Sequence, residues 1–192
     1  MPDRSSPPKT LRPLDAARLE ELALAYVARF ATTAGKLRVY LARKLRERGW
    51  EGEESPPVEV LVARFVAAGY IDDVAWARAK SGSLMRRGYG LRRVRQALDA
   101  AGVDAAIGAA ARPGVGAQRH AALALARKRG FGPFGRQARD QPLDRPLREK
   151  QIAAMLRAGH PLDSARELID AVTVAAAEEW AAAIADEDGD RL

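Results

Sequence analysis

The spacing of apolar residues along almost the whole 192-residue chain is helical. Apolar side chains recur every three or four positions, the interval that places them on one face of an α-helix. Successive apolar stripes begin at Leu19, Leu37, Val58, Leu91, Ile152 and Ala165. Strand-type alternation is not sustained over four or more residues, and alanine, the strongest helix former, is abundant. The sequence therefore predicts an all-α fold.

Glycines mark the expected ends of these helices. Four times an apolar residue is followed four positions later by glycine, at Gly49, Gly69, Gly102 and Gly159. Glycine suits the left-handed position just past a helix end because it has no Cβ. Three of these glycines are followed by an aspartate suited to cap the next helix: Asp72, Asp104 and Asp163. We expect short helices that depend on one another's packing for stability.

The glycine punctuation also suggests an internal repeat. Gly49, Gly102 and Gly159 recur at similar intervals, which predicts three tandem modules of about three helices each. We place the modules at residues 14–69, 70–113 and 118–175, after a disordered lead (residues 1–13) and before an acidic tail (residues 176–192). Modules that contact mainly their neighbours predict an elongated, curved body.

The formal charge of +7 is unevenly distributed along the chain. Six basic residues and no acidic residue lie between Lys80 and Arg95, whereas residues 178–190 hold acidic residues and no basic one. A concentrated positive field attracts polyanions, above all nucleic acid. Arginines that merely solvate helix surfaces are the alternative. The local absence of acids favours nucleic-acid binding.

Motifs for enzymatic chemistry fail in their sequence context. Residues Gly130–Gly135 match the dinucleotide fingerprint G-x-G-x-x-G, but a helical segment precedes them where a strand is needed, so we expect a turn. His120 and His160 lie far apart without an acidic cluster, and a contact with a helix end explains His160 better than a metal. The chain has no cysteine and no segment apolar enough to span a membrane. We expect a soluble cytoplasmic protein without cofactor or enzymatic activity.

Basic residues surround a two-glycine turn in the middle of the chain. The run Arg86-Arg87-Gly88-Tyr89-Gly90 ends one predicted helix, and Leu91 begins the next. Val94 and Leu98 are expected to face the core, so the arginines between them project outward, where they can grip phosphates or carboxylates bidentately. Backbone N–H groups at the start of this second helix can add to the anion site.

The same central region resembles the RecX family. The resemblance rests on Gly69–Arg78, with Trp76 where the family often has Phe, on Arg86–Gly90, on Arg92–Leu98, and on Gly102-Val103-Asp104, preceded by Ala101 where a basic residue is common. It covers about residues 14–175. It implies three tandem three-helix bundles of the helix-turn-helix kind that bind RecA filaments on DNA and limit filament growth, ATP hydrolysis and strand exchange.

The resemblance also indicates partners and binding residues. The expected partners are the RecA filament and single- and double-stranded DNA, bound by a monomer without regard to base sequence. The carried-over binding residues are Arg86, Arg87, Arg92, Arg93 and Arg95, with Lys36, Arg43 and Lys44 as a second set in the first module. Two alternatives stay open: a helix-turn-helix protein that reads duplex DNA without acting on RecA, and a helical scaffold that binds neither.

Overall fold

The computed structural model describes residues 12–135 and 144–183, and most of these residues are helical. The helices are α1 (Ala16–Arg29), α2 (Ala34–Arg48), α3 (Val58–Ala67), α4 (Asp73–Arg86), α5 (Leu91–Asp99), α6 (Ala105–Ala110), α7 (Val115–Arg129), the 3₁₀ helix η1 (Gly132–Phe134), α8 (Arg145–Ala158), α9 (Leu162–Asp170) and α10 (Val174–Ala182). Strand-type pairing in the described residues is limited to one isolated bridge between Leu14 and Trp50. The predicted all-α fold is confirmed.

The chain divides into two compact units, Met1–Asp73 and Val74–Leu192. One hydrophobic core lies in the first unit, and two separate cores lie in the second. The limits of the three predicted modules and their curved arrangement stay predictions. The expected disordered lead lies outside the described residues except for Arg12 and Pro13.

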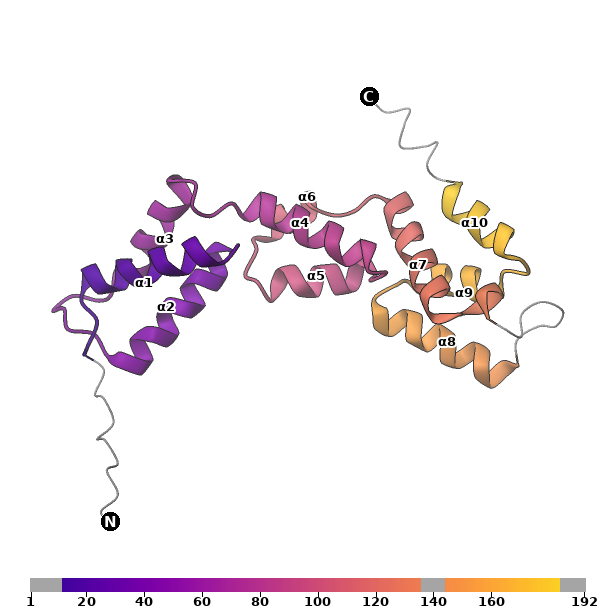
Figure 1. Cartoon of the computed structure of the whole chain (residues 1–192), viewed down its shortest axis with the longest axis horizontal. Helices are drawn as coiled ribbons and strands as arrows, with labels where there is room; N and C mark the ends of the chain where they lie inside the picture. The colour runs from indigo at the N-terminus through magenta and orange to yellow at the C-terminus, as the bar shows by residue number, and fades with distance from the viewer. Residues whose placement is uncertain (1–11, 136–143, 184–192) are drawn as a thin grey trace, which may run out of the picture. The chain divides into compact units, whose positions relative to one another are not determined.

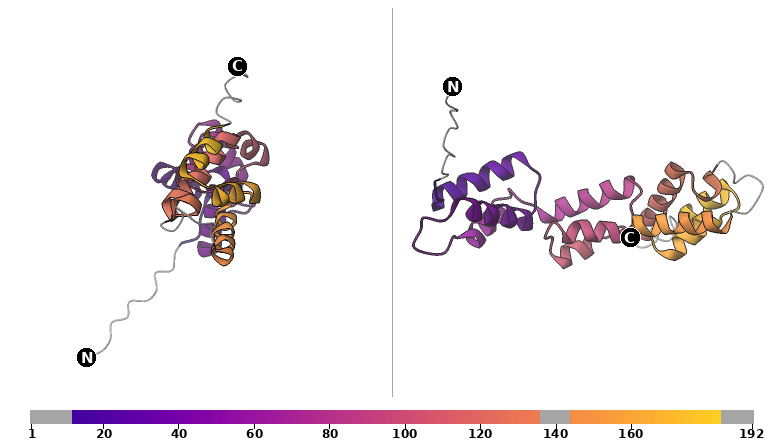
Figure 2. Two further views of the ribbon diagram at one scale, coloured as in Figure 1. Left: turned by 90° about the vertical axis from the view of Figure 1, so that its right-hand side faces the viewer. Right: turned by 90° about the horizontal axis from the view of Figure 1, so that it is seen from below.

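Helices α1, α2 and α3 form the first unit and lie side by side, as Figure 1 and the right-hand view of Figure 2 show. Helix α2 packs on both others, around a core that includes Leu19, Leu37, Leu41, Val62 and Phe65. Two side chains cap the start of α2: the Thr33 hydroxyl accepts the Lys36 N–H at 3.1 Å, and the Asp73 carboxylate accepts the Ala34 N–H at 2.9 Å. Asp73 is the first residue of α4, so its side chain caps a helix other than its own.

The glycine punctuation is confirmed. The φ angles of Gly49, Gly69, Gly102 and Gly159 are 82°, 76°, 65° and 98°. Asp104 caps α6 as predicted, because its carboxylate accepts the Ala106 N–H at 2.8 Å. The expectation for Asp163 is wrong: Pro161 precedes α9, and Asp163 lies inside the first turn, where its charge still interacts favourably with the helix dipole.

The second unit contains two groups of helices with their own cores. Helices α4–α6 surround a core that includes Ala77, Val94 and Leu98, and helices α7–α10 surround one that includes Met155, Leu168 and Ala181. Helix α10 packs on α7, where Arg119 donates to the Trp180 carbonyl at 2.8 Å and lies over the Trp180 ring. The packed chain therefore continues to Ala182, beyond residue 176, the expected start of the acidic tail. Residues 184–192 lie outside the described part.

Two glycine turns join these two groups of helices. The Gly90 N–H donates to the Ala158 carbonyl at 2.9 Å, and the Arg92 N–H donates to the Gly159 carbonyl at 3.2 Å. A Cβ atom on Gly90 would lie 2.3 Å from the carbonyl carbon of Gly159, closer than real Cβ contacts come. We call this contact between residues 88–90 and 158–160 the glycine junction. It is a direct backbone contact that any side chain would force apart.

Replacing Gly90 with alanine is expected to lower the free energy of unfolding by about 2 kcal/mol, the usual cost of overpacking a tight contact. Urea unfolding followed by circular dichroism measures the change. Gly116 supplies the matched control, because it lies inside α7 and a Cβ there meets nothing within 4 Å. Gly116→Ala should leave the protein as stable or raise its stability by about 0.5–1 kcal/mol. Equal stability of the Gly90→Ala and unmodified proteins would contradict the contact.

Candidate functional site

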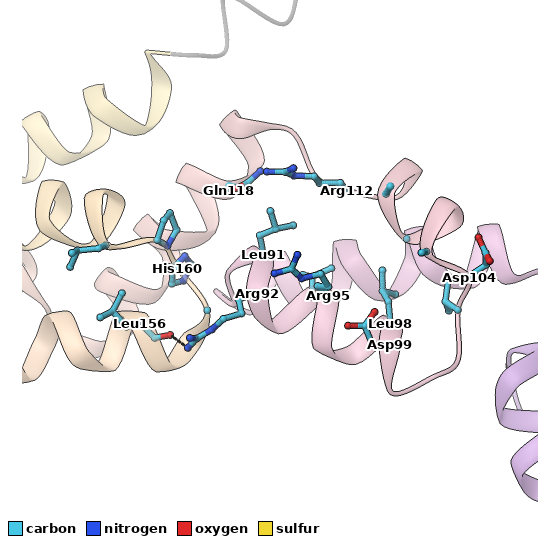
Figure 3. Close-up of a pocket in the computed structure, with 18 residues that line it drawn as sticks. Leu91, Arg92, Arg95, Leu98, Asp99, Asp104, Arg112, Gln118, Leu156 and His160 are labelled. Atoms are coloured by element: carbon cyan, nitrogen blue, oxygen red, sulfur yellow. Dashed lines mark hydrogen bonds between the residues drawn. The ribbon is translucent and has the colours of Figure 1, made fainter.

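A groove of about 740 Å³ lies within the second unit, between α5, α6 and the turn that joins α8 to α9 (Figure 3). Its apolar lining includes Leu91, Leu98, Leu156 and Leu162. Its charged lining consists of Arg92, Arg95, Arg112, Asp99 and Asp104. Because its walls come from both sides of the glycine junction, the groove exists only while the two groups of helices stay joined.

Two arginines flank the groove from opposite sides. Arg95 projects from α5, and Arg112 lies across from it, just after α6 (Figure 3). Both residues are exposed, and among the described residues neither makes an ion pair or a side-chain hydrogen bond. Arg95 was predicted as a binding residue, but Arg112 was missed, since it stands in a Pro- and Gly-rich stretch that appeared only as a break between modules. The two guanidinium groups are available to carboxylates or phosphates.

Arg92 and Arg93 make contacts inside the chain. The Arg92 guanidinium donates to the Leu156 carbonyl at the end of α8, and Arg93 donates to Gln96 at 3.3 Å. The expected anion site at the start of α5 is wrong, because the N–H groups of Gly90 and Arg92 are already bonded to the carbonyls of the glycine junction. Val94 and Leu98 are buried and the arginines around them exposed, as predicted.

The remaining predicted residues lie in two other places. Arg86 ends α4, and the Arg87 guanidinium lies 5.3 Å from the centre of the Tyr89 ring. Lys36, Arg43 and Lys44 belong to α2 in the first unit. Lys44 donates to Glu47 at 2.6 Å and Arg43 pairs with the same carboxylate, and the Lys44 hydrogen bond holds the pKa of Glu47 below its usual value.

His160 plays a larger part than its sequence context indicated. Its side chain is buried in the glycine junction, and its Nε2 lies 3.0 Å from the Gly88 carbonyl oxygen. The helix-end contact expected for it is thus replaced by a hydrogen bond that links residues 72 positions apart. Burial removes water from the ring and lowers the pKa of His160, so the neutral form is favoured and donates its Nε2 proton to the carbonyl.

Neither a metal-binding cluster nor a membrane-spanning helix is found among the described residues. No group of three His, Cys, Asp or Glu side chains among them could hold a metal ion. No helix in the described part is long and apolar enough to cross a membrane. The G-x-G-x-x-G stretch forms a left-handed Gly130 followed by η1, which is the turn that its context predicted.

Comparison with known proteins gives matches to proteins named RecX. No protein-family model matches the chain. The chain is 35% identical over 172 residues to the regulatory protein RecX of Myxococcus xanthus, which covers 85% of this chain and 90% of that protein. The regulatory protein RecX of Thermus thermophilus is 42% identical over 81 residues, 42% of this chain and 54% of that protein. The fold resembles the crystal structure of RecX from Lactobacillus salivarius, with a TM-score of 0.62 at 19% identity over 80% of this chain and 94% of that one.

The buried His160 predicts a pH-dependent stability. The unfolded histidine takes up a proton below about pH 6.5, whereas the folded one, whose pKa is lowered, resists it. The unfolded state therefore binds more protons, and the contribution of His160 is complete above pH 6.5 and lost as the pH falls below that value. The free energy of unfolding, measured in urea at pH 7.5 and 5.5, should fall further for the unmodified protein than for His160→Gln, whose amide can keep the bond to Gly88. Equal losses would show that His160 is not the group responsible.

Proposed function

Since the chain belongs to the RecX family, we propose that it is a non-enzymatic regulator of the RecA recombinase that binds the RecA–DNA filament and limits its growth, ATP hydrolysis and strand exchange. The observation that carries this proposal is the groove of the second unit. A groove that combines leucines with two unpaired arginines suits a protein segment with apolar and acidic side chains, because the leucines bury the apolar contact and the arginines supply charge complementarity.

DNA is the second proposed partner. Arg86 and Arg87 are exposed beside the glycine junction, outside the groove lining, and cations of this kind can neutralise phosphates without reading bases. Lys36, Arg43 and Lys44 supply further positive charge in the first unit. Such contacts give DNA binding that tolerates any sequence and weakens steeply as salt rises.

The proposed mechanism is obstruction of the filament. A monomer that holds RecA through the groove and DNA through its exposed cations occupies the place where a RecA subunit must be added or must move. Several weak contacts in one chain raise the overall affinity by effective concentration, so no single contact needs to be strong.

The helix-turn-helix alternative is disfavoured by the glycine junction. A recognition helix brings the residues of its N-terminal turn to the base edges in the major groove. At the start of α5 the N–H groups of Gly90 and Arg92 are bonded to the turn between α8 and α9, which covers this end of the helix. A sequence-reading helix would need that end to be open.

The proposal predicts inhibition that depends on the groove. RecA-driven strand exchange and DNA-dependent ATP hydrolysis should fall as the protein is titrated in. Reversing the two unpaired arginines of the groove, Arg95→Glu with Arg112→Glu, should raise the concentration for half-inhibition about tenfold, equivalent to about 1.4 kcal/mol of binding energy. Arg92 is left unchanged in this variant because its side chain supports the junction.

The matched control reverses two exposed arginines of the same unit that do not line the groove, Arg78 on α4 and Arg166 on α9. This double variant has the same net charge as the groove variant and should inhibit RecA almost normally. Equal losses in the two variants would mean that overall charge acts, not the groove. No inhibition by the unmodified protein at equimolar RecA would defeat the proposed function itself.

A further inference from the structure

Three aromatic rings form a continuous row in the first unit. The rings of Tyr26 and Tyr40 are stacked, with centroids 4.2 Å apart and planes inclined by 16°. The Phe30 ring follows Tyr26 at 5.3 Å. Tyr26 lies in the last turn of α1, Phe30 is the residue that follows α1, and Tyr40 belongs to α2. We call these three residues the aromatic row.

The row runs from the core to the surface. Tyr26 and Tyr40 are half-buried and pack against the core of the first unit, which fixes their positions. Phe30 lies outside that core and is 50% exposed. Its ring therefore contributes less to the free energy of folding than a fully buried Phe would. Packing on the core therefore fixes the two tyrosines, whereas half of the outer ring stays open to solvent.

Cations surround the same rings. The Arg29 guanidinium lies 5.6 Å from the centre of the Phe30 ring. Arg43 and Lys44 lie 5.7 and 6.0 Å from the centre of the Tyr40 ring. Glu47 pairs with Arg43 and Lys44, so it offsets one of their two charges, and Arg29 has no ion pair among the described residues. The surroundings of the row therefore keep a net positive charge.

We propose that the aromatic row is a binding site for the unpaired bases of single-stranded DNA. A base stacks against the exposed part of the Phe30 ring, and Arg29, Arg43 and Lys44 beside the row hold the adjoining phosphates. Single-stranded DNA fits because its bases present open π-faces, which a duplex hides within its own stack, and because aromatic stacking accepts every base. An acidic protein segment would pair with the same cations, and an abasic oligonucleotide tells the two partners apart, because only a base stacks on the ring. This proposal rests on the DNA-binding part of the proposed function and adds to it the kind of DNA and the ring that holds it.

The test uses the full chain without RecA and measures fluorescence anisotropy of labelled oligonucleotides at fixed salt. The probes are oligo-dT, an abasic oligomer of the same length, and a duplex. Phe30→Ala should weaken binding of oligo-dT about tenfold, as expected for the loss of one base–aromatic stack, and leave binding of the abasic oligomer and the duplex unchanged. Phe30→Leu, which keeps an apolar side chain there, should weaken oligo-dT binding as much, because only the ring is lost.

The control variant is Val39→Ala on α2, which removes another exposed apolar side chain of the first unit. It should bind all three probes normally, and thermal unfolding of each variant confirms that it is folded. Unchanged oligo-dT binding in both Phe30 variants, or an equal loss for oligo-dT and the abasic oligomer, would overturn the base-stacking site. Those results would leave RecA inhibition through the groove intact. Conversely, failure of RecA inhibition with a normal Phe30 effect would defeat only the proposed function.

Discussion

The arrangement of the second unit depends on the glycine junction. Carbonyl groups that end α8 accept hydrogen bonds from N–H groups that begin α5, so each helix end satisfies backbone groups that the other leaves open. The opposed ends also bring the positive end of one helix dipole to the negative end of the other. Arg92 and His160 add side-chain bonds from either side. The groove, whose walls come from both helix groups, takes its geometry from this contact.

Features that depend on local chemistry could be predicted from the sequence. Apolar periodicity predicted the helices because burial of one face is a property of each segment alone. The four helix-ending glycines were predicted because a left-handed backbone conformation excludes most other residues at that point. The burial of Val94 and Leu98, with exposed arginines around them, followed from the same helical spacing.

Features that depend on distant partners could not be predicted. Helical spacing placed Arg92 outward correctly, but only the fold brings the Leu156 carbonyl, 64 residues away, to its guanidinium. His160 looked like a helix-end residue because its partner, Gly88, lies in another glycine turn. Arg112 stands in a segment without apolar periodicity, so nothing local distinguished it from linker. Of the arginines that line the groove, Arg92 and Arg95 were predicted as binding residues, whereas Arg112, which lies across from Arg95, was missed.

The glycine junction also restricts how this protein can change over generations. A side chain on Gly90 would strike the backbone of Gly159, and a side chain on Gly159 would come within 2.7 Å of the Arg93 backbone nitrogen. Most core substitutions can be rescued when a neighbouring side chain shrinks, but here the obstructing atoms are main chain and cannot shrink. No second substitution at the facing position can restore the fit. A substitution at either glycine therefore cannot be compensated by a change at the other, and it is tolerated only if the whole turn is displaced.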